Sequence, residues 1–537
     1  MTTPSPTTVF DIPLIQDRIT HHLAVRDLCN CTRVSRSWNK TFKPYLWRVI
    51  NIRRRSNLDK FNSRETQAQL RQNTCHVQEV NSNFAEIWSY FRTCPLPNLT
   101  IIRSQCFKIW QANRAPNKYL HRIIALMDTS PNLHTLELQY FNYKAIEDSI
   151  FQAIQRHNSL RHIRILRIDN VGFSKLEQVL WAMYRLESAT LAISGCNDGA
   201  GWQPRLTGRE RVSELTNTPN PVCTLRALDW SAGELFNNSP QMFLQFLKSC
   251  PNLERLAPPL FHPENTYDQL GGIIASHLRH LQELDMHKVE MSGSVMARTI
   301  RACRGLRTFV SARQQRDMAV VVDALLRHRE TLEVLDLVNS NMSGSCLHTL
   351  LCACPNLQKV LAMATKRDKI YESIGDPVLA GKEMEEASEG SAWVCTNIKS
   401  LAVRYEHGPD SGQRLGFDNG ALGVGDEKRS TTILPGVLVR ELSRLVQLEE
   451  LRLGRVTFRV PHTSYGSLSM TTWTEHRNPG QWPTLKEGHR TVAAMLYALS
   501  GLKKLHTLEL RNLKEFVGEH VLEEVSKQWK GVKIQKS

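Results

Sequence analysis

The sequence predicts an α/β protein in which a short all-helical segment precedes an array of repeated strand–helix units. Three observations support this fold class. Near-identical stretches recur at Ser130–Leu133, Cys250–Leu253 and Cys354–Leu357, which read SPNL, CPNL and CPNL. Each of them precedes a run of alternating apolar residues. The chain has 537 residues, which is too long for one ordinary compact domain unless it is a repeat array.

The strands are predicted by the pattern L-x-x-L-x-L, which starts at the leucine of PNL. Its apolar residues alternate, and this is the spacing of side chains on one face of a strand. Well-formed copies start at Leu133, Leu281, Leu332, Leu448 and Leu505. Looser copies start at Leu160, Leu186, Leu225, Leu253, Leu306, Leu357 and Ile398.

A helix is predicted upstream of each strand. Counted back from the leading leucine, positions −10 and −6 are apolar in nine copies, which places them on one helical face. Position −3 lies on the same helical face, and in two copies it is occupied by Cys250 and Cys354. Proline then stops the helix because it has no amide hydrogen, and asparagine makes the turn into the strand. The nine pairs are Ile123/Met127, Ile150/Ile154, Leu176/Leu180, Phe243/Leu247, Met296/Ile300, Val322/Leu326, Leu347/Leu351, Leu438/Leu442 and Met495/Leu499.

Several strand starts follow one another at intervals of 25 to 28 residues. One strand and one helix per unit at this period resembles the leucine-rich-repeat family. The resemblance implies a curved solenoid, with a parallel sheet inside the curve and helices outside. Neighbouring units must stack, because a single unit cannot bury its own apolar face. An ordinary α/β domain with buried parallel strands is the alternative, and the regular period argues against it.

The remaining stretches of the chain depart from this period. We expect a disordered terminus at residues 1–8, a helical segment at 9–52, a linker or helical connector at 53–90 and the solenoid at 91–537. Inserts interrupt the solenoid near residues 194–222, 364–394, 408–431 and 455–490. Inserts of this length are either functional or disordered.

The helical segment is predicted to contain three short helices. Asp11 and Pro13 mark the start of the first, Asp27 can cap the second and Ser35 can cap the third, which Pro44 is expected to end. Three helices of about ten residues make too small a core to be stable alone. We therefore expect this segment to bind a partner surface.

Residues 12–47 resemble the F-box family. The matching residues are Ile12-Pro13, Ile19, Leu23, Asp27-Leu28, Val34-Ser35-Arg36, Trp38 and Leu46-Trp47, while Leu14 departs from a pattern that commonly has glutamate there. The resemblance implies docking on a small SKP-type adaptor, which joins a cullin scaffold carrying a RING protein. The adaptor contacts that it implies are Ile12, Pro13, Leu14, Leu28, Val34, Trp38, Leu46 and Trp47.

The order of the two parts also carries a resemblance. An F-box followed by irregular leucine-rich repeats, with Trp393 and Cys395 in a late insert, is most similar to fungal F-box proteins with leucine-rich repeats. The resemblance implies the substrate-recognition subunit of an SCF-type cullin–RING E3 ubiquitin ligase, in the cytoplasm, the nucleus or both. A leucine-rich-repeat scaffold in a non-degradative complex is the alternative. A nucleic-acid binder is a weaker third interpretation.

A protein substrate is expected to bind the inner face of the sheet. The side chains between the buried leucines form a patch that is acidic on one side and apolar on the other. Exposed apolar side chains in a row are unusual unless something covers them. Either the substrate or the insert after Leu357 would cover them. The residues concerned are Glu283, Asp285, His287, Val334, Asp336, Val338 and Lys359.

Missing motifs argue against other functions. The sequence has no GxxxxGK[ST], HExxH or GxSxG, so we expect neither enzymatic activity nor a cofactor. Its thirteen cysteines include no CxxC, which argues against a zinc site, and we expect them to be reduced thiols. No apolar run approaches the length of a membrane span.

The net charge of +16 raises the question of nucleic acid. The densest basic clusters are Arg53–Arg55 and the group Arg298, Arg301 and Arg304, and both are predicted to lie away from the inner strand face. This placement argues against nucleic acid and favours solvated surfaces. For Arg53–Arg55, an import signal or contact with an acidic partner is the alternative.

Overall fold

The computed structural model describes residues 12–91, 93–104, 116–138, 141–142, 149–171, 173–196, 223–232, 234–235, 239–262, 264–311, 318–338, 340, 344–364, 393–405, 442–453, 502–510 and 533–536. The chain forms two compact units, Met1–Pro263 (unit 1) and Glu264–Ser537 (unit 2), and we describe each by itself. The expected disordered terminus at 1–8 and most of the four expected inserts lie outside the described residues.

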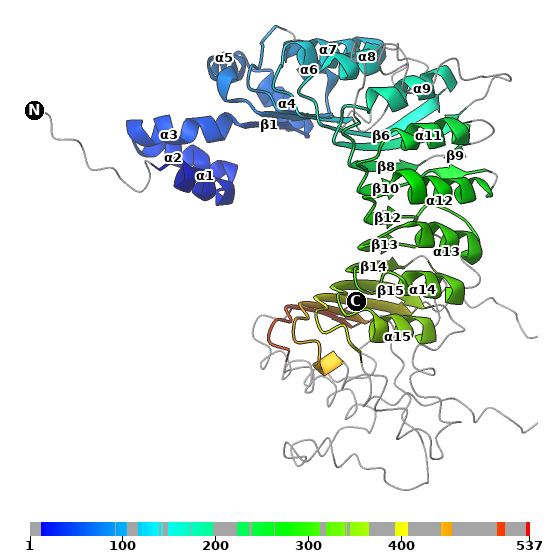
Figure 1. Ribbon diagram of the computed structural model, residues 1–537. Coiled ribbons are helices and arrows are strands. Elements are labelled where there is room, and N and C mark those ends of the chain that lie inside the picture. The colour runs from blue at the N-terminus through cyan, green and yellow to red at the C-terminus, as the bar shows by residue number, and fades with distance from the viewer. Residues whose placement is uncertain are drawn as a thin grey trace, which may run out of the picture. The chain divides into compact units, whose positions relative to one another are not determined.

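Unit 1 begins with three helices and continues as alternating strands and helices (Figure 1). Its helices are α1 (Pro13–His22), α2 (Val25–Val34), α3 (Arg36–Trp47), α4 (Arg55–Phe61), α5 (Arg64–Asn73), the 3₁₀ helix η2 (Thr74–His76), α6 (Ala85–Phe91), α7 (Pro116–Asp128), α8 (Ser149–Arg156), α9 (Phe173–Ala182) and α11 (Ser239–Lys248). Its strands are β1 (Val49–Ile52), β2 (Glu79–Ser82), β3 (Ile101–Ser104), β4 (Thr135–Leu138), β5 (Phe141–Asn142), β6 (His162–Val171), β7 (Ser188–Cys196), β8 (Ala227–Ala232), β9 (Glu234–Leu235), β10 (Arg255–Ala257) and β11 (Leu260–Phe261).

The main sheet of unit 1 is parallel throughout its described pairs. Its strands run in the order β1-β2-β3-β4-β6-β7-β8-β10, so each strand of a repeat lies beside the strand of the next. The apolar residues of neighbouring strands lie opposite one another, with Ile102 opposite Leu136 and Leu136 opposite Ile163. Strands β9 and β11 form a second, two-stranded sheet.

Unit 2 repeats this pattern with shorter connections between its first strands. Its helices are α12 (Thr266–His277), α13 (Gly293–Ala302), α14 (Met318–Leu326) and α15 (Gly344–Ala353), which lie along one side of the strands (Figure 1). Its strands are β12 (Glu283–Asp285), β13 (Thr308–Val310), β14 (Val334–Leu337), β15 (Lys359–Ala364), β16 (Ser400–Tyr405), β17 (Glu450–Leu453), β18 (Thr507–Leu510) and β19 (Lys533–Lys536). All of them pair in parallel, in chain order.

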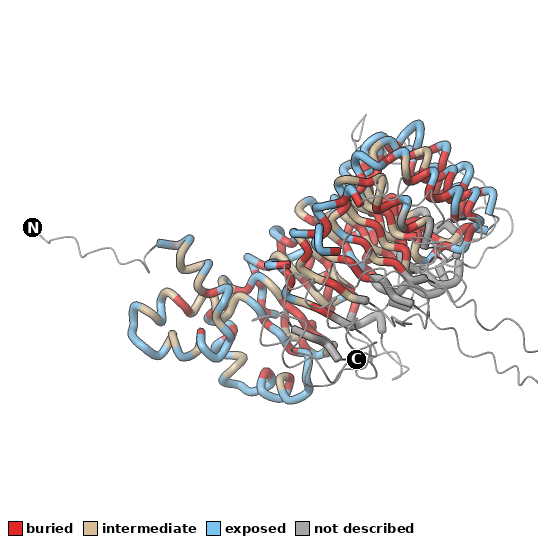
Figure 2. Tube along the Cα trace, turned by 90° about the horizontal axis from the view of Figure 1, so that it is seen from below, coloured by how far each residue is buried: buried red, intermediate tan, exposed pale blue. Residues whose placement is uncertain are grey.

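The core lies between the helices and the sheet in both units. Each leading leucine of the predicted strands is buried, and so is Ile398. The helical stripe is also buried in the described copies, including Cys250, Cys303 and Cys354 at position −3, while Leu326 is half-buried. Figure 2 shows buried residues throughout the repeats, whereas the three N-terminal helices are mostly intermediate or exposed. The parallel α/β array with outer helices is confirmed.

The structure differs from the sequence prediction at two positions of the N-terminal helices. Helix α2 has Ala24 at its N-cap, so Asp27, which was expected to cap it, lies inside its first turn. Helix α3 continues to Trp47 and contains Pro44, which was expected to end it. Proline removes one main-chain hydrogen bond, here to residue 40, and this loss does not end a helix that neighbours hold on both sides of the proline. Helix α3 packs along α2 and contacts β1 and α5. Its start at Ser35 agrees with the prediction, because the Ser35 hydroxyl accepts a hydrogen bond from the Trp38 amide at 3.1 Å.

The sheet also begins earlier than residue 91. Strands β1 and β2 lie in stretches assigned to the helical segment and to the connector, yet they pair with each other and β2 pairs with β3. Their four-residue apolar patterns, such as buried Ile50 and Ile52, are too short and lack the leading leucine that marks the later strands. The connector is therefore part of the repeat array.

Candidate functional site

The three N-terminal helices are held together by polar contacts as well as by a small core. The side-chain amide of Asn39 donates to the Thr32 oxygen at 2.9 Å, which joins α3 to α2. Arg48, just after α3, pairs with Asp17 of α1 at 3.3 Å. Burial, and then the nearby Asp17 carboxylate, raise the pKa of Tyr45, while Arg48 lowers it. The helices therefore form one small body.

Apolar side chains of this body remain on its surface. Leu14 is 68% exposed and Val34 is 63% exposed, as the prediction of adaptor contacts requires. Val25 is 71% exposed and was not among the predicted contacts, although it is the first residue of an amphipathic helix. Leu28 is only 6% exposed, so its side chain belongs to the core and not to the docking surface. Of the other predicted contacts, Ile12 is exposed, Trp38, Leu46 and Trp47 are half-buried, and the side chain of Pro13 lies outside the described residues.

The helical body joins directly to the sheet of unit 1. Helix α3 ends at Trp47 and β1 begins at Val49, so a single residue separates them. The main-chain oxygen of that residue, Arg48, accepts hydrogen bonds from the amides of Gln78 and Glu79 at 2.9 and 3.0 Å. A partner bound to the helices would therefore be placed firmly relative to the repeats of unit 1.

In unit 2, five of the seven predicted substrate residues lie on strands, on the sheet face that the helices leave open. The other two, His287 and Val338, lie just after the ends of β12 and β14. The register places Glu283, Thr308, Val334 and Lys359 in one row across β12 to β15. A second row contains Asp285, Val310, Asp336 and Leu361. All of these side chains are half-buried except Lys359, which is exposed. The expected acidic and apolar residues thus share one surface, which we call the open face of unit 2. They are not separated into two sides as predicted, because Asp336 lies between Val310 and Leu361.

The two aspartates of the open face also have a structural role. The Asp285 carboxylate accepts from the His287 amide at 3.2 Å and lies 2.6 Å from His287 Nδ1. The Asp336 carboxylate accepts from the Val338 amide at 3.1 Å. Both carboxylates therefore fix the chain where it leaves the strand, and the Asp285 side chain is only 18% exposed. Sequence spacing gives no signal for this second role.

The corresponding face of unit 1 carries a compensated charge cluster. Arg103 of β3 lies between Glu79 of β2 and Glu137 of β4, pairing with both, the latter at 3.2 Å. Burial lowers the pKa of Arg103, but the two carboxylates outweigh this effect and raise it. The cluster links three neighbouring strands and leaves no net positive site at its centre.

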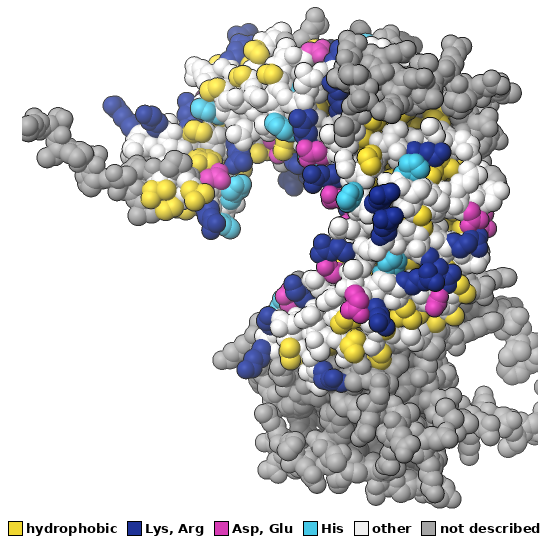
Figure 3. Space-filling model, in the orientation of Figure 1, with side chains coloured by type: hydrophobic (Ala, Val, Ile, Leu, Met, Phe, Trp, Pro, Cys, Tyr) yellow, Lys and Arg dark blue, Asp and Glu magenta, His cyan; other side chains and the backbone are white. Residues whose placement is uncertain are grey.

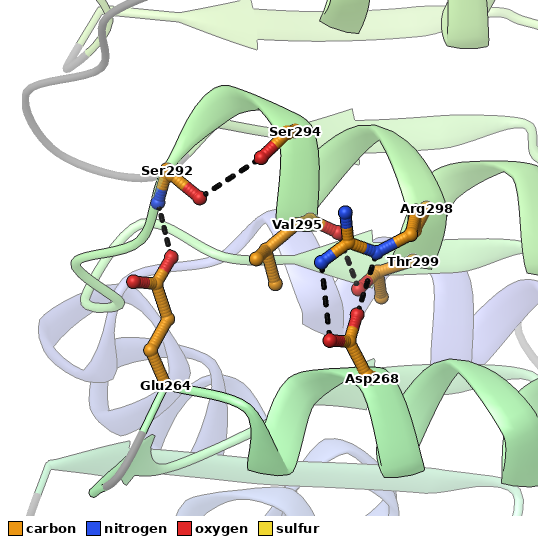
Figure 4. A network of polar contacts seen from close by, with 7 residues as sticks. All are labelled: Glu264, Asp268, Ser292, Ser294, Val295, Arg298 and Thr299. Carbon is orange, nitrogen blue, oxygen red and sulfur yellow. Dashed lines mark hydrogen bonds and ion pairs between the residues drawn. The ribbon is translucent and has the colours of Figure 1, made fainter.

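The arginine run on α13 is paired with the neighbouring helices. Arg298 makes two hydrogen bonds to Asp268 of α12, at 2.7 and 3.1 Å (Figure 4). Arg301 pairs with Asp323 of α14 at 2.6 Å, while Arg304 is exposed. In the same network Glu264 accepts from the Ser292 amide at 2.6 Å, just before α13 begins. Arg298 and Arg301 therefore join repeat units and present little free charge to a polyanion, whereas Arg304 follows the end of α13.

Three buried cysteines of the repeats have raised pKa values, which is the opposite of an activated thiol. Burial raises the pKa of Cys303 to about 12 and that of Cys354 to about 11, so both are neutral at pH 7. Burial likewise raises the pKa of Cys250, which lies 3.4 Å from Cys223. A nucleophilic cysteine needs a lowered pKa. Within the described residues, no three His, Cys, Asp or Glu side chains are placed to hold a metal ion.

The comparisons with known proteins bear on the N-terminal body. Residues 15–53 match the family model described as F-box-like. The N-terminal body is an F-box-like domain. The comparison with curated proteins gave no match. Among solved structures, a leucine-rich-repeat protein of Leptospira interrogans is similar at 12% identity, covering 87% of this chain and 98% of its own, with a TM-score of 0.34.

That TM-score is too low to support the fold, which rests on the strand register and helix positions of this chain. The F-box-like domain is followed by repeated units of one strand and one helix. Among the described helices, none combines the length and apolar character that a bilayer crossing requires.

Proposed function

We propose that this protein is the substrate-recognition subunit of an SCF-type cullin–RING ubiquitin ligase. Its F-box-like domain docks on an SKP-type adaptor, and its repeats hold a protein substrate. The observation that carries the proposal is the match at residues 15–53, together with the exposed Leu14, Val25 and Val34 of the same domain. Apolar side chains this exposed on a body with so small a core are expected to be covered by a partner.

The junction between domain and repeats supports this arrangement. A substrate receptor must hold its cargo at a set distance from the ubiquitin carrier, which a loose linker would not do. The direct step from α3 to β1, with Arg48 hydrogen-bonded to β2, provides such a connection to unit 1. We propose that the protein itself performs no chemistry and that it acts in the cytoplasm, the nucleus or both.

A non-degradative scaffold is the second candidate, since the same adaptor contact serves either purpose. Nucleic-acid binding is disfavoured by the ion pairs of Arg103, Arg298 and Arg301. Affinity capture of the full chain, with and without proteasome inhibition, tests the proposal. Co-purification of the adaptor and the cullin is expected, with a partner that is ubiquitylated and accumulates under inhibition. Adaptor without ubiquitylated partner would favour the scaffold, and absence of adaptor would refute both.

A further inference from the structure

Positive charge is concentrated in the F-box-like domain. Residues 15–53 contain eight Lys or Arg and two Asp, a formal net charge of +6, while the whole chain carries +16. More than a third of the net charge therefore lies in about a fourteenth of the chain. Such a density of exposed charge is either neutralised within the protein, left to water and counterions, or available to attract a partner of opposite charge.

The repeats show what internal compensation looks like in this protein. Arg301 pairs with Asp323 at 2.6 Å, and Arg307 donates to Glu333 at 3.0 Å. In each case, the carboxylate comes from a neighbouring unit, so the charge is neutralised as the units stack. These paired arginines therefore contribute little to the field outside the protein.

The F-box-like domain lacks this compensation. Arg18, Arg26, Arg33, Arg36 and Lys40 are all exposed. In the described part of the chain, none of these five cations has a carboxylate oxygen within 4.0 Å. Arg18 lies on α1. Arg26 and Arg33 lie near the two ends of α2, and Arg36 and Lys40 lie in the first half of α3. We call these five residues the basic rim.

The domain's own acidic residues do not neutralise the basic rim. Asp17 is engaged with Arg48 at 3.3 Å and with His21 at 3.5 Å. Asp27 is exposed in the first turn of α2, where the helix dipole already favours it. The rim therefore faces solvent with its charge intact.

The basic rim and the exposed apolar side chains occupy the same three helices, and Figure 3 shows both kinds together there. From this juxtaposition, we infer that the domain docks on a protein surface that is apolar at its centre and acidic around it. The inference rests on the proposed function and deepens it, because it gives the adaptor's contact surface a charge. The apolar contacts supply affinity, and the basic rim speeds association by attracting the acidic surface.

The test uses the full chain and a purified SKP-type adaptor. The variant R26E/R36E reverses two charges of the basic rim. Both residues lie in the first turn of a helix, α2 and α3, where an acidic side chain suits the helix dipole, so the fold is not weakened. The association rate at low salt is expected to fall about tenfold or more. Raising the salt should slow the wild type and leave the variant nearly unchanged.

The matched control is R279E/R304E. These two arginines are exposed in unit 2, and the substitutions change the net charge by the same amount. An association rate near that of the wild type is expected for the control. Equal slowing in both double variants would show that only total charge matters, and would overturn the inference.

Two further results would overturn it while leaving the proposed function standing. One is an unchanged, salt-independent association rate of R26E/R36E with the adaptor. The other is tight binding of the wild type to phosphatidylserine vesicles or duplex DNA at 0.15 M salt, lost in R26E/R36E, with adaptor binding unaffected. The basic rim would then serve a membrane or a nucleic acid. A chain that binds no adaptor at all under any condition refutes the proposed function itself.

Discussion

The side-chain amide of Asn252 donates a hydrogen bond to the main-chain oxygen of Cys223, one repeat earlier, with Nδ2 and O separated by 3.1 Å. The same bond recurs wherever the described chain reads PNL. It joins Asn98 to Cys75 at 2.6 Å, Asn132 to Pro97 at 3.1 Å and Asn356 to Glu330 at 2.8 Å. The asparagine of PNL is therefore a link between repeats as well as a turn residue.

This link predicts a cost for its removal. Asn252→Ala should lower the free energy of unfolding by about 1 kcal/mol, the usual net value of one hydrogen bond. His280 occupies the same position, directly before a leading leucine, and is also exposed. His280→Ala should stay within about 0.5 kcal/mol of the wild type. Urea denaturation of the three proteins measures both effects, and equal losses would mean that the link contributes nothing.

The sequence was informative about the repeats because they are periodic. A leucine such as Leu253 begins a strand in every unit. An irregular copy can therefore be assigned by comparison with the regular ones. Pro44 shows the opposite case. A single proline in α3 has no repeats to compare with, and its helix continues because α2, β1 and α5 hold it. Strand β1 was missed for the same reason, since its pairing with β2 is decided by contacts distant in sequence.

The candidate site was predictable in composition but not in geometry. Spacing placed Asp285 and Asp336 on one face of the sheet, which the register confirms. Their hydrogen bonds to the main chain two residues later depend on how the chain leaves each strand, and no pattern encodes that. Similarly, an apolar residue of a short helix can face in or out, which is why Leu28 was counted as a contact while Val25 was not.

Val34, one of the exposed valines of the F-box-like domain, gives the sharpest test of adaptor docking. Val34→Asp should leave folding intact because the side chain is already in water. In the complex it would place an unpaired charge in an apolar contact, at several kcal/mol, so affinity for the adaptor should fall about a hundredfold or more. Val446→Asp, at another exposed valine, in unit 2, is the control and should bind normally. Calorimetric titration with the adaptor measures both affinities. Undiminished binding of Val34→Asp would show that this end of α2 lies outside the interface.

The open face of unit 2 is tested by removing charge without removing a hydrogen-bond acceptor. In D285N/D336N the amide oxygens can still accept from the main-chain amides of His287 and Val338, so thermal unfolding should change little. Substitution of both aspartates with lysine would instead remove both hydrogen bonds, so that a loss of binding could not be distinguished from a loss of stability. Capture of a substrate should weaken, and its salt dependence should flatten, while adaptor binding is unchanged. Quantitative capture from cells at two salt concentrations measures this.

The control for that experiment is D128N/E330Q, which removes two exposed carboxylates, one at the end of α7 and one in the turn after α14. Its set of captured partners should match that of the wild type. If D285N/D336N also captures the same partners at the same strength, substrate binding belongs elsewhere on the chain, such as the stretches between the strands.

A buried histidine predicts a pH dependence of stability in unit 2. His328, just after α14, accepts a hydrogen bond from the Leu306 amide at its Nδ1, 3.3 Å away, and its Nε2 lies 3.0 Å from the Ile300 oxygen. This arrangement requires the neutral ring, protonated only at Nε2. Burial lowers the pKa of His328 from 6.5, the hydrogen bond to Ile300 partly opposes this, and the charge of Arg327 lowers it further.

Because the folded-state pKa is below the unfolded value, the unfolded chain binds the proton first as the pH falls. The contribution of His328 to stability is therefore complete above pH 6.5 and decreases as the pH drops from there toward the folded-state pKa, below which it is constant. His328→Asn removes this proton linkage. It should be less stable than the wild type at pH 7.5, and the gap should narrow at pH 5. Thermal unfolding of both proteins across this range is the measurement. A gap that does not change with pH would show that His328 has the same pKa in the folded and the unfolded chain.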